Sequence, residues 1–132
     1  MFANSQMMGL DTGFPDVCLT PMPAPVPIPY PAIGIGPMGV PAAYNILSMF
    51  TPTHNLMTTI PMTNGDNTGI AMGVVCPTVM APTRPVTGAF TVLVNGAPVT
   101  RVTSLNNGNM FNNPMLNART VPSQVKWTVL SP

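Results

Sequence analysis

Residues 16–31 read DVCLTPMPAPVPIPYP, and this stretch decides how the chain can fold. Every second residue from position 21 to position 31 is proline, which fixes its own φ and lacks a backbone N–H. Such a segment is held extended, in polyproline II or edge-strand geometry, and cannot donate along a full strand ladder. The residues between the later prolines are Val26, Ile28 and Tyr30, whereas flexible linkers carry polar spacers. We therefore expect a packed, extended strap.

The remaining composition predicts an ordered, mainly β domain. The 132 residues include 18 Pro and 11 Gly, close to the level at which disorder becomes the default, but 45% of them are hydrophobic. Short strands joined by many tight turns reconcile the two observations. We expect one compact, cone-shaped domain of hairpins over residues 1–132, in which residues 1–13 could form a flexible N-terminal segment.

Hairpin patterns follow the strap. Residues 90–102, FTVLVNGAPVTRV, form the clearest predicted hairpin, with Asn95-Gly96 at its turn. Asn64-Gly65 and Asn107-Gly108 are further turn dipeptides. Strands are expected over residues 69–76, 88–94, 97–102 and 125–130. Residues 42–49, AAYNILSM, are expected to form the single short helix, with Pro41 at its first position.

Two parts of the chain resemble each other at a constant offset of 46 residues. The matching positions are Ile46-Leu47, Pro52, Asn55, Leu56 and Thr58 in the first copy and Val92-Leu93, Pro98, Arg101, Val102 and Ser104 in the second. The match predicts two related hairpins packed about one pseudo-symmetric axis. Neither could bury its apolar face alone.

Charge is scarce. The chain has four Lys+Arg and three Asp+Glu, 5% charged residues against about 25% in an ordinary soluble domain. Either much of the surface is covered by a partner, or it is built from Thr, Asn, Ser and backbone. Nucleic acid is not an expected partner, because the basic residues are widely spaced in the sequence: Arg84, Arg101, Arg119 and Lys126.

We expect neither a membrane helix nor a signal peptide from this sequence. Residues 17–65 carry no charge, but their many prolines exclude a spanning helix. The first ten residues lack the basic head and continuous apolar core of a secretion signal. Cys18 and Cys76 do not make a disulfide framework, so reduced thiols in a cytoplasmic assembly are expected.

Several motifs, in this order, resemble the PAAR-like family with the PIPY motif. They are FPDVCLTPMPAPVPIPYP (14–31), PTHNLMTTIPMTNGDNTGIAMGVV (52–75), FTVLVNGAPVTR (90–101), NNGN (106–109) and VPSQVKWTVL (121–130), so the similarity runs over nearly the whole chain. The resemblance implies a compact β-cone that caps the VgrG trimer of a type VI secretion spike, one copy per trimer, and links effector or adaptor proteins to it.

The resemblance also implies which residues carry this role. The signature strap maps to Pro27, Ile28, Pro29 and Tyr30; the turns map to Asn64, Gly65, Asp66, Asn95 and Gly96; and Pro122-Ser123-Gln124 leads into the last strand. The chain departs from the family at Cys76-Pro77, where Ser-Gly is expected, and at Thr103-Ser104, where Asp is expected. Relatives often continue into a toxin domain, so a chain that stops at Pro132 is expected to carry no fused cargo or to be an excised tip.

The inventory for metal or catalytic chemistry is small. PAAR tips are expected to hold a metal near the apex, and the soft ligands are Cys18, His54 and Cys76, with Asp66 or water as a conceivable fourth. Their scattered positions favour two buried thiols and a hydrogen-bonded histidine, without zinc or another cofactor. His54 could also activate Cys18 or Cys76 as a nucleophile, but neither thiol lies in a stabilising motif.

We therefore expect a structural spike tip without enzymatic activity. It would be cytoplasmic before firing, then secreted with the spike, and would touch the target membrane only on puncture. The tip of a related phage-like contractile injection machine is the near alternative, and a small cysteine hydrolase is the distant one.

Overall fold

The computed structural model describes residues 1–113 and 116–130 and shows the expected mainly β fold. The strands are β1 (Leu10–Thr20), β2 (Val26–Ile35), β3 (Ala43–Ser48), β4 (Thr51–Thr53), β5 (Thr63–Asn64), β6 (Arg84–Pro85), β7 (Ala89–Val94), β8 (Ala97–Val99), β9 (Leu105–Asn107) and β10 (Asn117–Val121). Two 3-10 turns, η1 (Gly36–Met38) and η2 (Asn109–Phe111), complete the elements. No helix in the described ranges is long and apolar enough to cross a membrane.

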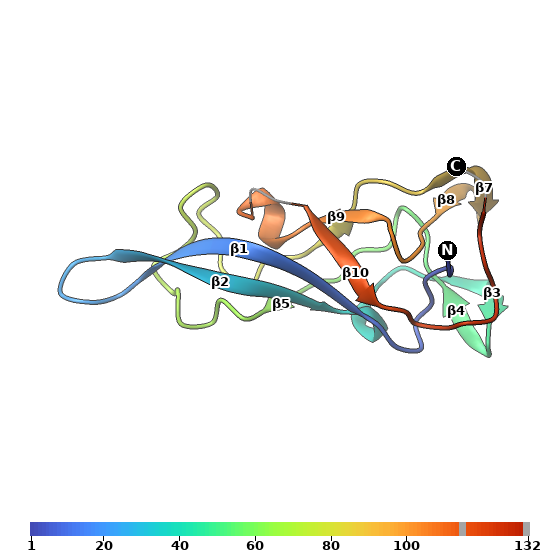
Figure 1. Cartoon of the computed structure of the whole chain (residues 1–132), viewed down its shortest axis with the longest axis horizontal. Helices are drawn as coiled ribbons and strands as arrows, with labels where there is room; N and C mark the ends of the chain where they lie inside the picture. Colours follow the sequence, from blue (N-terminus) through green and yellow to red (C-terminus); the bar gives the residue numbers. More distant parts are fainter. Residues whose placement is uncertain (114–115, 131–132) are drawn as a thin grey trace.

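A long hairpin of β1 and β2 forms the narrow half of an elongated molecule (Figure 1). The pair belongs to a six-stranded antiparallel sheet of order β5-β2-β1-β10-β9-β6. The proline-rich stretch is strand β2 and the loop before it, so it is extended as predicted. It is less packed than predicted, because Val26 is exposed and Ile28 and Tyr30 are only half-buried. Strand β1 is the main neighbour of this stretch: Cys18 pairs with Ile28, and Leu19 pairs with Pro27. The prolines themselves donate no backbone hydrogen bond to a neighbouring strand, because they lack an N–H group.

The opposite, broad end holds two hairpins, β3–β4 and β7–β8, that are copies of each other (Figure 1). Ala43 pairs with Thr53 in the first and Ala89 with Val99 in the second, which is the offset of 46 that the sequence predicted. Both hairpins have the same bulge after the first alanine, and both turn through two residues of positive φ. The internal repeat is therefore confirmed.

The two ends of the chain form a third strand pair beside these hairpins. Phe2 bridges Thr128, and the amide of Ala3 donates to the carbonyl of Trp127 at 3.0 Å. Three equivalent bridges then join the pairs in a closed ring: Asn55 with Val99, Arg101 with Ala3, and Ser5 with Thr53. The broad end thus has pseudo-three-fold symmetry, with the chain termini in place of the third hairpin turn.

Backbone hydrogen bonds repeat around the same ring. Leu56 donates to Pro98, Val102 to Phe2 and Gln6 to Pro52, at 2.8, 2.9 and 2.9 Å. A core of small apolar side chains fills the centre: Ala3, Ala43, Ala89, Val94, Val99 and Val129, with Trp127 packed against them. Trp127 therefore anchors the base.

The N-terminal residues are part of this core. Residues 1–13 were a candidate flexible segment, but Ala3, Asn4 and Ser5 are buried and Leu10 begins β1. The amide of Asn4 donates to Thr100 and its carbonyl accepts from the amide of His54, while the amides of Ala3 and Ser5 donate to Trp127 and Ser123, so the segment is built into the fold.

Four local predictions are wrong. Residues 42–49 form strand β3 instead of a helix, because Ala43 is paired across the hairpin to Thr53. Residues 69–76 form turns and one bridge. Residues 125–130 form no continuous strand and pair with the N-terminus only through the bridge at Thr128 and the backbone hydrogen bonds of Trp127 and Val129. Asn107 ends strand β9 and Gly108 is extended, so this dipeptide makes no hairpin turn.

Candidate functional site

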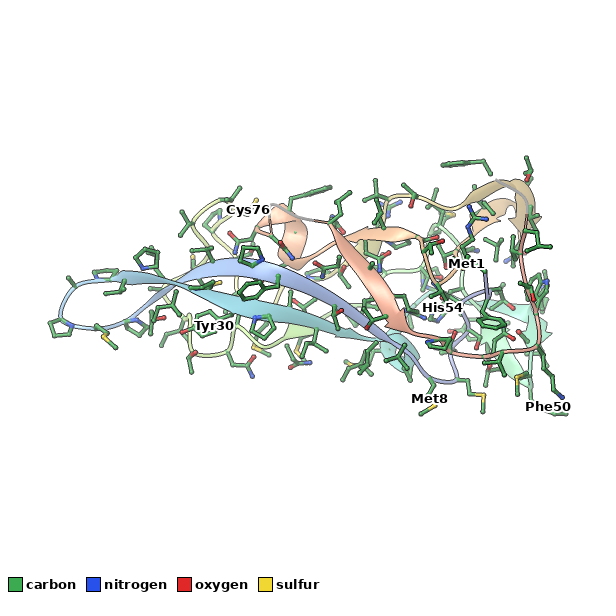
Figure 2. The ribbon with its side chains drawn as sticks, viewed as in Figure 1. Met1, Met8, Tyr30, Phe50, His54 and Cys76 are labelled. Atoms are coloured by element: carbon green, nitrogen blue, oxygen red, sulfur yellow. The ribbon has the colours of Figure 1, made fainter. Side chains whose placement is uncertain are left out.

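The signature strap lies beside the strand that carries a buried polar cluster. The motif residues Pro27, Ile28, Pro29 and Tyr30 pair with residues 16–19 of β1. The hydroxyl of Tyr30 is hydrogen-bonded to that of Thr20 at 2.7 Å, which fixes the ring at the narrow half of the molecule (Figure 2). The strap is therefore the sheet neighbour of strand β1, whose residues carry the polar groups.

The turn Asn64-Gly65-Asp66, at the end of strand β5, lies beside the same polar cluster. Asn64 pairs with Ile33 of β2, and Gly65 has φ 119°. A Cβ at Gly65 would lie 2.0 Å from the carbonyl oxygen of Pro31, so only glycine allows this approach. The next residue, Asp66, is fully buried against β1.

Asp16, Cys18 and Asp66 form the centre of the cluster. The Cys18 thiol lies 3.8 Å from Asp16 Oδ1 and 3.7 Å from Asp66 Oδ2, and all three side chains are inaccessible to solvent. Burial, reinforced by the two carboxylates, raises the pKa of Cys18 to about 12. Burial also raises the pKa of Asp16, against the lowering effect of its amide partners. Cys18 is thus a protonated thiol at neutral pH and a poor nucleophile.

Two asparagines hold the carboxylates from the other side. Asn109 Nδ2 donates to Asp16 at 3.0 Å and to Asp66 at 2.9 Å, while Asn112 Nδ2 donates to Asp16 by a short bond. Their amide oxygens accept from backbone N–H groups, that of Asn109 from Ala81 at 2.8 Å. These acceptor bonds orient both amides with their N–H groups toward the carboxylates.

The turn Asn95-Gly96 lies at the other end of the molecule, on the base. Positive φ values of 56° and 82° make it the turn that the sequence predicted. Exposed apolar side chains surround the base on all three strand pairs: Tyr44, Leu47 and Phe50 on the first, Phe90 and Leu93 on the second, and Met1, Val125 and Leu130 on the third. A groove of about 380 Å³ runs between Phe50 and Trp127.

His54 belongs to neither end. It is buried behind the base (Figure 2), where it lines a cavity of about 20 Å³ together with Asp11 and Arg119. Arg119 Nε donates to Asp11 Oδ1 at 2.6 Å in a buried ion pair. Burial, with a smaller effect of the Arg119 charge, lowers the pKa of His54 to about 3, so its ring is neutral.

The structure therefore divides the predicted site residues into two groups. The PIPY strap and the Asn64-Gly65-Asp66 turn come together around Cys18, and Asn95-Gly96 stands apart on the base. His54 and Cys76 lie far apart along the molecule (Figure 2), and neither belongs to the cluster of potential metal ligands among the described residues. Sequence reasoning missed Asp16, Asn109 and Asn112; the spacing of Asp16 and Cys18, which places both on one face of a strand, was the available signal.

This architecture defines a class of β-rich domain that has a pseudo-three-fold base and a narrow half formed by the hairpin of β1 and the proline-rich strand β2. The chain belongs to the Toxin PAAR-like domain family, which matches residues 9–115. Neither the curated proteins nor the solved structures gave a match.

Proposed function

We propose that this chain is a structural tip protein that caps the VgrG trimer of a type VI secretion spike. The observation that carries the proposal is the closed ring of three strand pairs at the base. A single chain can match three identical partner chains only if its contact surface repeats three times about one axis. The base has this repeat, and family membership is consistent with a spike-tip role.

The chemistry of the base supports the same partner. Each of the three strand pairs exposes large apolar side chains, and Leu47 and Leu93, which occupy equivalent positions in the repeat, are 59% and 61% exposed. Burial of this apolar surface against a partner removes it from water and so favours binding. Few long charged side chains surround it, so docking would order little rotamer-rich surface.

The positions of the candidate catalytic residues support a non-enzymatic role as part of this proposal. Cys18 is buried with a raised pKa, and His54 lies apart from Cys76 and lines a cavity about the size of one water molecule. These positions favour a passive tip over a cysteine hydrolase. In this proposal the protein is cytoplasmic before firing and links an effector or adaptor to the spike. On firing it is secreted with the spike, and it contacts the target membrane only on puncture.

Co-purification with a cognate VgrG tests the proposal. We expect a complex with one copy of this chain per VgrG trimer. Leu47→Asp and Leu93→Asp, at equivalent positions of two strand pairs, should each weaken the complex strongly. Met22→Asp is the matched control, since Met22 is also 59% exposed but lies in the loop at the narrow end. Equal binding by all three variants would contradict docking through the base.

A further inference from the structure

A small polar cavity lies on the pseudo-three-fold axis of the base. Three residues at equivalent positions of the repeat line it: His54 and Thr100 are 46 residues apart, and Asn4 takes the third place. Each of them directly follows a residue that is bridged in the closed ring of strand pairs. The amide of Asn4 donates to the carbonyl of Thr100, and the amide of His54 donates to that of Asn4, at 2.9 and 3.0 Å. Each strand pair therefore contributes one polar residue to a shared cavity.

The six-stranded sheet closes the cavity with a balanced pair of charges. Asp11 of β1 and Arg119 of β10 line it, and Arg119 Nε donates to Asp11 Oδ1 at 2.6 Å. Asn106 Nδ2 donates to the other oxygen of Asp11 at 2.7 Å. An ion in the cavity would add an unbalanced charge in a place that is removed from solvent. The site therefore suits a small neutral ligand.

Three polar atoms of the cavity wall lack a hydrogen-bond partner within the described part of the chain. They are Asn4 Oδ1, His54 Nε2 and Arg119 Nη1, on residues that are only 4%, 2% and 4% exposed. Other polar side chains of the wall, such as those of Asn55 and Thr58, already donate to backbone carbonyls. Buried polar atoms without a partner lose their hydration without compensation. A ligand that bonds to all three would restore what folding removes.

The three atoms match the bonding of one water molecule. Arg119 Nη1 can only donate, Asn4 Oδ1 can only accept, and Nε2 of the neutral His54 ring does one or the other. Water offers two donors and two acceptors, and a buried water typically makes about three hydrogen bonds. A cavity needs roughly 10–15 Å³ to hold one water molecule, and this cavity has about 20 Å³. It therefore has room for a single molecule.

We propose that the axial cavity binds one long-lived internal water molecule through Asn4 Oδ1, His54 Nε2 and Arg119 Nη1. Asn4 belongs to the strand pair formed by the chain ends, His54 follows β4, and Arg119 lies in β10. The water thus joins two strand pairs of the base to the six-stranded sheet of the narrow half. This inference does not depend on how the base docks.

Water-selective NMR spectroscopy on the full chain tests the proposal. Ile60 lines the cavity and is 4% exposed, so its methyl protons should show a cross-peak at the water frequency with the sign of a long-lived contact. Val129 is the matched internal control, because it is 3% exposed but packs in the apolar core, and it should show none. A wild type without the Ile60 cross-peak would overturn the proposal. An equally strong cross-peak at Val129 would overturn it too, since water would then reach the whole interior.

Two substitutions of His54 test the assigned ligand atoms. His54→Leu removes the ring nitrogen and should lose the Ile60 cross-peak, whereas His54→Gln keeps a polar group and should retain it. An unchanged cross-peak in His54→Leu would contradict the role of His54 as a ligand.

A high-resolution crystal structure of the wild type decides even if the leucine variant fails to fold. We expect one ordered water about 2.7–3.2 Å from each of the three atoms. An empty cavity, or an ion in place of water, would overturn the proposal.

Discussion

The turn of the β3–β4 hairpin offers a test that separates folding from docking. Its two residues, Met49 and Phe50, have φ of 50° and 66°, and Phe50 is 97% exposed. The equivalent turn of β7–β8 uses Asn95-Gly96, residues that accept positive φ readily. A bulky side chain in a left-handed conformation, pointing into solvent, does not help the isolated protein. We therefore expect the double substitution Met49→Asn/Phe50→Gly to stabilise the fold and to weaken docking.

The magnitudes follow from the geometry. A non-glycine residue in the left-handed region costs about 1–2 kcal/mol, and glycine returns about 0.5–1 kcal/mol of this through the entropy of the unfolded chain. The double variant should gain about 1–2 kcal/mol in free energy of unfolding. A phenylalanine side chain offers roughly 150–250 Å², so burying half of it on docking is worth about 2–3 kcal/mol at 25 cal/mol per Å². Binding to VgrG should weaken roughly 30- to 150-fold.

Urea unfolding and calorimetric titration with a cognate VgrG measure the two effects separately. The control is Met22→Ala, which removes a 59% exposed side chain at the narrow end and should change neither quantity appreciably. A double variant that binds as tightly as the wild type would show that this turn lies outside the interface. A less stable variant would refute the argument about backbone strain.

Three further predictions concern stability. Gly65→Ala should lose more than about 3 kcal/mol in free energy of unfolding, measured with urea, because the new Cβ would lie 2.0 Å from a backbone oxygen and the residue has φ 119°. Gly96→Ala should lose only about 1–2 kcal/mol, because no atom lies within 4 Å of its new Cβ. Similar losses in the two variants would contradict the steric argument. Arg119→Met should cost about 3–5 kcal/mol by leaving Asp11 buried without its partner, and Asp11→Asn in addition should recover part of it; no recovery would mean that lost packing dominates. The pKa of His54 is about 3 in the folded protein and 6.5 in the unfolded chain, so the unfolded chain takes up the proton first and the free energy of unfolding falls as the pH drops below about 6.5. Between pH 7 and pH 5 the wild type should lose about 2 kcal/mol more than His54→Gln. Parallel pH profiles of the two proteins would show that the ring is not held neutral.

The sequence predicts those parts of the fold that depend on local chemistry. The alternating prolines specify an extended strap, and Asn95-Gly96 between two Val-rich runs specifies a hairpin. The offset of 46 residues identifies the two related hairpins, since equivalent bulges and turns need similar residues at equivalent places. The third strand pair is not visible in this way, because it is assembled from the two chain ends and lacks a turn.

Errors arose where long-range pairing outweighs local preference. Residues 42–49 contain apolar positions that also fit a short helix, and only the pairing of Ala43 with Thr53 decides for a strand. The buried cluster was half recognised: Cys18 and Asp66 were considered as ligands, but together with His54 and Cys76. The topology brings Asp16 to Asp66, 50 positions further along the chain, which no spacing rule could indicate.

A cryo-electron microscopy structure of the complex with a cognate VgrG tests the central claim most directly. Our account predicts one copy of this chain on each trimer, with each of the three strand pairs of the base over a different VgrG chain and the β1–β2 loop pointing away from it. Three copies per trimer, or contact through the β1–β2 loop, would contradict it.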